Sequence, residues 1–261
     1  MRPSADAVRR LAEAGVPSPE FDARVLTEHA SATGADLEQL LTRRAAREPL
    51  QHLTGEAHFR YLTLAVGSGV FVPRPETEVL AGWAVDQARE LQAPVVVDLC
   101  TGSGAIALSV ATEVPNARVY AVELGNDAVE WARRNLAGSG VDLRHGDMAD
   151  AFHELDGTVD VVVSNPPYIP LEAYESVAPE ARDHDPALAL WSGDDGLDAM
   201  RVVEAVAARL LRPGGVVGAE HADVQGEAAP EVFAGAGRWA DVRDHLDLAG
   251  RPRFVTARLA R

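Results

Sequence analysis

Lysine is absent from this chain, and cysteine occurs only once. All 24 basic residues are therefore arginines, and 40 acidic residues outweigh them to give a formal net charge of −16. We interpret the preference for arginine as the codon bias of a GC-rich genome. The single cysteine excludes an intrachain disulfide and any metal site built from several cysteines. The acidic balance disfavours a protein that holds duplex nucleic acid, because such binding depends on clustered cations.

Long apolar runs are missing as well. No stretch approaches the roughly 20 apolar residues that cross a bilayer, and the opening residues Arg2 to Asp6 are unlike a secretory signal. We therefore expect a cytoplasmic protein that makes no membrane contact. The eight histidines show no spacing typical of a metal site, so we expect no metal. We also expect a monomer.

The spacing of apolar residues divides the chain into unequal units. In residues 1–57 the apolar residues recur at helical spacing, which predicts a small helical domain. Residues 58–73 hold two short extended runs on either side of Gly67-Ser68-Gly69, which predict a β-hairpin that links the units. Residues 74–261 alternate strands and helices, as a doubly wound α/β sheet requires.

The fold expected for the larger unit is a Rossmann-like sheet of seven strands, with one reversed edge strand. The expected strands are 95–99, 118–122, 141–145, 159–164, 215–220, 241–247 and 254–259. The expected helices between them are 105–114, 127–137 and 196–211. Open α/β sheets bind ligands outside the carboxyl ends of their strands, so residues that follow these strands are candidate site residues.

A glycine-rich turn, Asp98-Leu99-Cys100-Thr101-Gly102-Ser103-Gly104, follows the first of these strands. Its glycines adopt backbone angles forbidden to other residues and let a ligand approach the main chain. Glu123 ends the next strand, about twenty residues on, at the spacing typical of a ribose-binding carboxylate. The third glycine of the dinucleotide fingerprint is replaced by Ala107. We therefore predict a cationic nucleoside without a pyrophosphate, S-adenosyl-L-methionine, with its ammonium near Asp98 and its ribose at Glu123.

Asp147 and Met148 follow the third strand. The aspartate could accept a hydrogen bond from an adenine amino group, and Met148 could pack on the ring. An alternative is that Gly146-Asp147 is an ordinary turn.

The stretch Ser164-Asn165-Pro166-Pro167-Tyr168 ends the fourth strand. A primary amide or an exocyclic amine carries two N–H groups, and the side-chain oxygen of Asn165 and the carbonyl of Pro166 could each accept one. Tyr168 could stack on a flat acceptor and stabilise developing positive charge. The motif therefore predicts methyl transfer to a planar nitrogen, with Asn165, Pro166 and Tyr168 as catalytic residues, Pro167 beside the substrate and Asn165 also beside the cofactor. The alternative is a proline turn with a packed tyrosine.

With these motifs in place, the chain resembles the release factor glutamine methyltransferases (PrmC/HemK family). The resemblance covers nearly the whole chain and rests on the stretches 47–55, 71–78, 98–106, 164–169, 194–198, 211–215 and 247–251. It implies a class I methyltransferase fold that transfers a methyl group to the glutamine side-chain nitrogen in the Gly-Gly-Gln loop of peptide chain release factors. The product of the cofactor would be S-adenosyl-L-homocysteine.

The resemblance also implies roles for single residues. Cys100 to Gly104 would line the cofactor, Glu123 would bind its ribose, Met148 would lie by the adenine, and Asn165 to Tyr168 would hold the glutamine. Many relatives have glycine, aspartate and tryptophan at positions 100, 123 and 148, so the methionine would lose aromatic stacking. A further departure is His221, where glycine is common.

Arg74 and Glu76 lie in Pro73-Arg74-Pro75-Glu76-Thr77-Glu78, the element most specific to this family. They could form a surface ion pair at a helix start, worth under about 1 kcal/mol. The resemblance instead favours a place near the cofactor or the incoming loop.

Two other functions compete with a protein glutamine methyltransferase. One is an amino-methyltransferase that acts on an exocyclic base nitrogen of DNA or RNA, which the acidic balance disfavours. The other is a nucleoside-binding module without catalysis, which the intact motif at Asn165 disfavours. We expect the N-terminal helices to help position the release factor, because a catalytic loop alone gives little contact area.

Overall fold

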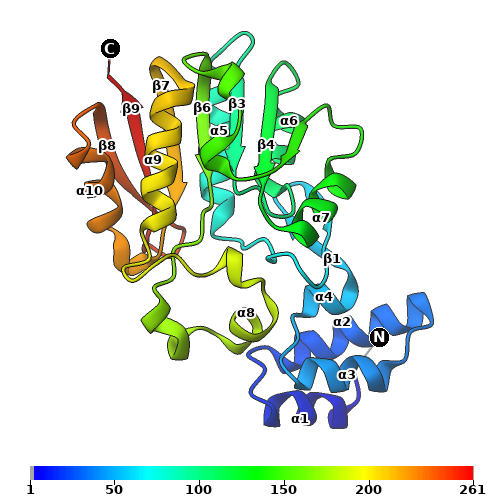
Figure 1. Cartoon of the computed structure of the whole chain (residues 1–261). Helices are drawn as coiled ribbons and strands as arrows, with labels where there is room; N and C mark the ends of the chain where they lie inside the picture. The colour runs from blue at the N-terminus through cyan, green and yellow to red at the C-terminus, as the bar shows by residue number, and fades with distance from the viewer. Residues whose placement is uncertain (1–2, 261) are drawn as a thin grey trace.

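The computed structural model describes residues 3–260, in which a bundle of short helices lies beneath a larger α/β unit (Figure 1). The bundle consists of α1 (Ala5–Glu13), α2 (Pro19–Thr33), α3 (Leu37–Ala45) and α4 (Leu50–Thr54). Helix α1 starts where the Ser4 hydroxyl accepts a hydrogen bond from the Ala7 amide, and α2 ends at Gly34, whose φ is 77°. Leu11 and Leu26 are fully buried in the core between the helices.

The larger unit is built on a seven-stranded sheet with the order β5-β4-β3-β6-β7-β9-β8. Its strands are β3 (Val95–Leu99), β4 (Arg118–Glu123), β5 (Asp142–His145), β6 (Val159–Ser164), β7 (Leu211–Glu220), β8 (Trp239–Leu246) and β9 (Pro252–Leu259). The pairs among β3 to β7 are parallel, whereas β9 is antiparallel to both of its neighbours. The predicted α/β fold with seven strands is therefore confirmed.

The place of the reversed strand differs from the prediction. The reversed strand is β9, which lies between β7 and β8, so the edge strand β8 is not reversed. Residues Phe254 to Ala257 are buried in succession, as expected of a strand with neighbours on both sides. No residue of β8 is fully buried, which fits an edge position.

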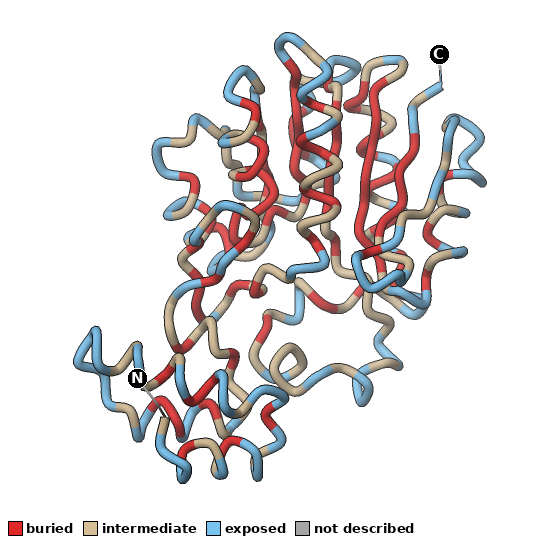
Figure 2. The backbone as a smooth tube through the Cα atoms, turned by 180° about the vertical axis from the view of Figure 1, so that it is seen from behind, coloured by how far each residue is buried: buried red, intermediate tan, exposed pale blue. Residues whose placement is uncertain are grey.

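Helices cover both faces of the sheet (Figure 1). They are α5 (Thr77–Arg89), α6 (Ala105–Glu113), α7 (Asn126–Leu136), α9 (Asp198–Leu210) and α10 (Ala228–Gly235). Val96 and Val161 pack in the core that α5, α6 and α7 share, whereas Val97 and Val162 pack in the core beneath α9 and α10. The central strands are consequently buried on both faces, as Figure 2 shows.

The hairpin between the units lies earlier in the chain than the sequence predicted. Strand β1 (Glu56–Phe59) pairs with β2 (Leu62–Ala65), so the turn lies at residues 60–61. The predicted turn at Gly67-Ser68-Gly69 and the strand after it are wrong. A Cβ added at the first of these glycines would stand 2.5 Å from the ring of Trp131. That glycine therefore allows the close approach of α7 and does not form a hairpin turn.

Residues 171–190, here called the bridging segment, connect the loop after β6 to the region before α9. The segment contains η3 (Leu171–Ser176), α8 (Pro179–His184) and η4 (Ala187–Ala189), and it lies beside the N-terminal bundle (Figure 1). The other short turns are η1 (Met148–Asp150), η2 (His153–Leu155) and η5 (Asp223–Gln225). Within residues 3–260, none of the helices has the length and apolar character needed to cross a bilayer.

Candidate active site

A cavity of 530 Å³ opens at the carboxyl ends of β3, β4, β5 and β6, where open α/β sheets bind ligands. Its walls also include the start of α5, the bridging segment and α9. The predicted site residues that line it are Arg74, Cys100, Thr101, Gly102, Ser103, Glu123, Asp147, Met148, Asn165, Pro167 and Tyr168. The other predicted residues all lie within 3–260 but do not line it, namely Glu76, Asp98, Gly104 and Pro166.

The glycine loop after β3 has an unusual backbone. Cys100, Gly102 and Gly104 all have left-handed conformations, with φ of 61°, 58° and 86°. Such angles are uncommon for a residue with a side chain, so Cys100 is a strained position. At Gly104 the constraint is also steric, because an added Cβ would stand 3.0 Å from the side chain of Leu136.

Asp98 lies beneath this loop and not in the cavity. It is fully buried, and its Oδ2 accepts hydrogen bonds from the Thr101 hydroxyl at 2.5 Å and the Ala107 amide at 3.1 Å. Burial raises the pKa of Asp98 to about 7, although these two hydrogen bonds lower it. Asp98 therefore fixes the loop to the first turn of α6, and it has no surface in the cavity, where the ammonium was expected.

Glu123 joins the end of β4 to the glycine loop. Its Oε2 accepts a hydrogen bond from the Gly102 amide at 2.8 Å, and its Oε1 accepts one from the Gly125 amide at 2.7 Å. A carboxylate has about four acceptor positions, so two remain for ligand hydroxyls. The sequence predicted the ligand role of this residue but not its hold on the loop.

Cys100 and Met148 touch on one wall of the cavity, where Cys100 Sγ lies 3.5 Å from Met148 Sδ. Burial and the nearby carboxylates raise the pKa of the Cys100 thiol, so it stays protonated at neutral pH. Asp147 starts the adjacent turn, where its side chain accepts a hydrogen bond from the Ala149 amide at 2.9 Å. The protonated cysteine thus packs against Met148.

The loop after β6 places an amide and a phenol at the cavity. Asn165 Nδ2 donates to Thr77 Oγ1 at 3.3 Å, and the Tyr168 hydroxyl donates to Glu220 Oε1 at 3.1 Å. Pro166 is buried behind the loop. Neither Thr77 nor Glu220 is among the predicted site residues. The sequence signal for Glu220 was its place at the end of a buried strand, because a buried carboxyl needs hydrogen-bond partners.

Arg74 contacts the bridging segment and not Glu76. Its Nη2 lies 2.9 Å from Asp185 Oδ2, and its guanidinium stacks over the Phe71 ring at 4.8 Å. Burial raises the pKa of Asp185 to about 6, and the charge of Arg74 opposes that shift. The alternative of an Arg74–Glu76 surface ion pair is therefore wrong for this structure, and Glu76 is exposed outside the cavity.

His221, which departs from the family pattern, joins β7 to β8. It is fully buried, with Nε2 2.9 Å from Asp244 Oδ1 and Nδ1 2.9 Å from the Ala222 carbonyl oxygen. A glycine could make neither contact. His221 thus links the end of β7, which carries Glu220, to β8 by a side-chain hydrogen bond, and this contact explains the departure.

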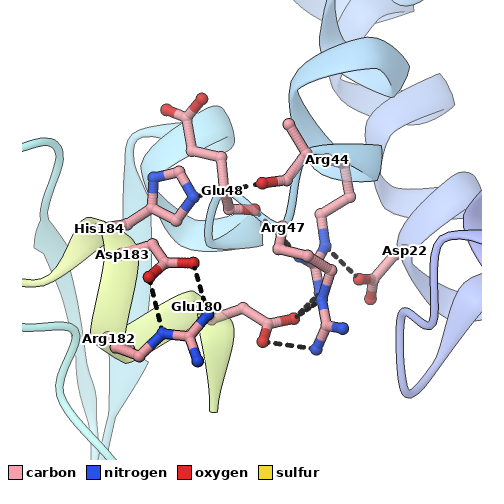
Figure 3. A network of polar contacts seen from close by, with 9 residues as sticks. Asp22, Arg44, Arg47, Glu48, Glu180, Arg182, Asp183 and His184 are labelled. Carbon is pink, nitrogen blue, oxygen red and sulfur yellow. Dashed lines mark hydrogen bonds and ion pairs between the residues drawn. The ribbon is translucent and has the colours of Figure 1, made fainter. Parts of the chain in front are cut away.

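An arginine cluster joins the N-terminal bundle to the bridging segment (Figure 3). Arg44 Nε lies 2.7 Å from Asp22 Oδ2, and its Nη2 lies 3.0 Å from Glu180 Oε1. Arg47 forms two further hydrogen bonds to the same glutamate. The side chain of Arg44 is only 6% exposed, so this cluster is an interior contact between the units and not a surface ion pair.

Comparisons with known proteins give one consistent reaction class. The family model described as "Methyltransferase small domain" matches residues 77–179. The release factor glutamine methyltransferase of Streptomyces coelicolor is 59% identical over 98% of this chain and 96% of its own length. The 4-amino-L-phenylalanine/4-methylamino-L-phenylalanine methyltransferase of Streptomyces pristinaespiralis is 42% identical over 90% of this chain and 87% of its own. A solved methyltransferase from Pyrococcus furiosus has a similar fold, with a TM-score of 0.52, 18% identity, and coverage of 76% of this chain and 89% of that one.

Proposed function

This chain belongs to the release factor glutamine methyltransferase family, and from that premise we propose that it methylates the side-chain amide nitrogen of the glutamine in the Gly-Gly-Gln loop of peptide chain release factors. The observation that carries the proposal is the 59% identity to the Streptomyces coelicolor enzyme over nearly the whole of both chains. Because release factors act on the ribosome, the proposed place of action is the cytoplasm, and the proposed effect is modulation of translation termination.

The residues around the cavity suit the chemistry of S-adenosylmethionine. The left-handed loop from Cys100 to Gly104 brings main chain to the cavity, and Glu123 keeps free acceptor positions for ribose hydroxyls. Asp147 and Met148 would hold the adenine from the end of β5. When bound, this cofactor supplies an electrophilic methyl group on a sulfonium. None of these contacts uses a metal ion.

The acceptor side of the cavity fits a neutral amide. Asn165 uses its Nδ2 on Thr77, which leaves its Oδ1 free to accept an N–H from the substrate glutamine. Pro166 is buried in this structure. Its carbonyl would therefore accept the second N–H only after the loop has moved. Fixing both hydrogens orients the weakly nucleophilic nitrogen, and alignment of this kind contributes on the order of several kcal/mol. The ring of Tyr168 would stabilise positive charge by about 0.5–2 kcal/mol.

We also propose that three parts share the work: residues 1–57 recognise the substrate, residues 58–73 link, and residues 74–261 carry out methyl transfer. The arginine cluster supports this division, because it fixes the helical bundle to the bridging segment, which lines the cavity. A substrate protein that reaches the cavity would meet both units.

Labelled S-adenosylmethionine with a purified release factor tests the proposal. The matched control is the same release factor with alanine in place of the loop glutamine. We expect label on the first protein only. Two further arms offer 4-amino-L-phenylalanine and duplex DNA or RNA as acceptors, which test the activity named for the relative from Streptomyces pristinaespiralis and the base-methylating alternative. Equal labelling of both release factors, or labelling of another acceptor instead, would contradict the glutamine assignment.

A further inference from the structure

The amide oxygen of Asn165 has to face the cavity if this residue is to hold the substrate, a requirement that rests on the proposed function. An asparagine amide ends in an acceptor oxygen and a donor NH₂ group of nearly the same shape, so it fits a pocket in two orientations. Only one of them offers an acceptor to a substrate N–H. The group behind Asn165 decides between the two.

The Thr77 hydroxyl is that group. Thr77 is the buried first residue of α5, and its Oγ1 lies 3.3 Å from Asn165 Nδ2. A hydroxyl has one hydrogen to donate and lone pairs that accept. It accepts from Asn165 only while its own hydrogen points to another acceptor. If that hydrogen pointed to Asn165, the amide oxygen would turn toward Thr77 and away from the cavity.

Glu220, the last residue of β7, is the candidate for the other acceptor. It is 1% exposed, and its Oε1 accepts a hydrogen bond from the Tyr168 hydroxyl. Its Oε2 is buried and has no hydrogen-bond partner among the described residues, so it has acceptor positions to offer, and interaction with the Thr77 hydroxyl lowers the pKa of Glu220. We propose that Glu220 and Thr77 are positioning residues that turn the amide oxygen of Asn165 toward the substrate. The same carboxyl holds the phenol of Tyr168.

The orientation then depends on whether Glu220 is ionised. An ionised carboxylate only accepts hydrogen bonds, so it draws both hydroxyl hydrogens toward itself. A protonated carboxyl instead donates a hydrogen to Thr77. The Thr77 hydroxyl is then free to donate to Asn165, which favours the opposite orientation of the amide.

The surroundings of Glu220 place its ionisation, and with it the change in amide orientation, near neutral pH. Burial raises its pKa to about 7. Thr77, Arg253 on β9 and Tyr168 lower the pKa, whereas Glu76 before α5 raises it. The neighbouring His221 directs its ring nitrogens to Asp244 and to a main-chain carbonyl, and not to Glu220. Because the ionised form is the productive one, the rate of methyl transfer increases as the pH rises through about 7.

A pair of variants at Thr77 tests the hydroxyl. Thr77→Val keeps the shape of the side chain and removes the hydroxyl, whereas Thr77→Ser keeps the hydroxyl. With a release factor as substrate, we expect kcat of Thr77→Val to fall by about a hundredfold, the effect of misplacing a reacting group. KM should change much less, and Thr77→Ser should recover most of the rate. Equal kcat for the two variants would overturn the proposal.

Glu220→Gln tests the carboxyl. In the wild-type protein the pH profile of kcat should rise with a midpoint near 7, and this rise should be lost in Glu220→Gln. A second readout needs no catalysis: the side-chain NH₂ resonances of Asn165, identified by their loss in Asn165→Ala, should shift with the same midpoint only in the wild type. A rise or shift that persists in Glu220→Gln contradicts the proposal.

Two controls keep the outcomes separate. Circular dichroism checks that each variant is folded, and if Glu220→Gln does not fold, the pair at Thr77 decides alone. A wild-type protein that labels no release factor contradicts the proposed function. An active wild type with unaffected variants contradicts only the role of Thr77 and Glu220.

Discussion

Arg47 holds Glu180 with two parallel hydrogen bonds, from Nε at 2.8 Å and from Nη2 at 2.6 Å. The arginine follows helix α3, and the glutamate lies in α8, 133 residues further along the chain. Bidentate pairs of this kind fix geometry as well as contributing energy. The N-terminal bundle is therefore attached to the bridging segment, which lines the cavity.

Breaking this pair should loosen the bridging segment. In a double-mutant cycle of Arg47→Ala and Glu180→Ala, we expect a coupling free energy of about 1–2 kcal/mol in urea unfolding. We also expect faster hydrogen exchange in residues 171–190, because α8 loses its anchor. Asp183→Ala is the matched control on the same helix, since its ion pair with Arg182 is more exposed and should contribute under about 1 kcal/mol. Additive single effects would mean that the pair does not couple the units.

Asn165→Ala should abolish methyl transfer without abolishing cofactor binding. The alanine offers no acceptor to the substrate amide, so we expect kcat on a release factor to fall by at least about a hundredfold. Calorimetry should show the affinity for S-adenosylmethionine within a few fold of the wild type. Asn116→Ala changes an exposed asparagine before β4 and is the control. A loss of cofactor binding in Asn165→Ala would make this residue part of the cofactor site or of the folded core.

Cys100 and Met148 should compensate for one another. Their sulfur atoms are 3.5 Å apart, so a tryptophan at position 148 would meet the cysteine side chain. Overpacking of this kind costs about 1–3 kcal/mol. We expect Met148→Trp alone to weaken binding of S-adenosylhomocysteine, and Cys100→Gly combined with Met148→Trp to restore it or improve on it. Calorimetry on the wild type, both single variants and the double variant measures the coupling, and simple additivity would count against compensation.

Asp98→Asn should change how stability depends on pH. Burial raises the pKa of Asp98 from 3.8 to about 7. A carboxyl raised in this way stabilises the folded state when protonated, so its contribution is complete below about pH 4 and is lost as the pH rises through about 7. Asparagine does not titrate. Relative to the wild type, the variant should therefore gain up to about 1.4 kcal/mol per pH unit across that window.

Urea unfolding of both proteins at about pH 5 and about pH 8 measures this difference. The Thr101 and Ala107 hydrogen bonds can be kept by the amide oxygen of the asparagine, so the comparison isolates the charge. An identical stability difference at both pH values would mean that Asp98 does not titrate near neutrality.

The central strands were predictable because they are buried on both faces. Runs such as Val95-Val96-Val97 and Val161-Val162-Val163 contain no polar residue that a helix surface or a loop would need. The cavity followed from the same strands, because loops at their carboxyl ends meet at one edge. Glu123, Met148 and Asn165, which follow three of these strands, all line that cavity.

What the sequence did not reveal depends on contacts between distant segments. Gly67 resembled a turn residue, yet its lack of a side chain serves the approach of Trp131, which no local pattern shows. Asp98 resembled a ligand, yet it is buried beneath the loop that it supports. Thr77 and Glu220 are far apart in sequence, and they can interact only because α5 packs against β7 in the folded chain.

The position of β9 has a consequence for how this chain is made. Strands β7 and β8 each pair with β9 and not with one another, so during synthesis both have an unpaired side until residues 252–259 leave the ribosome. Exposed strand edges of this kind are where chains associate wrongly. The nascent protein is therefore at its most vulnerable when six of the seven strands have been made and β9 has not.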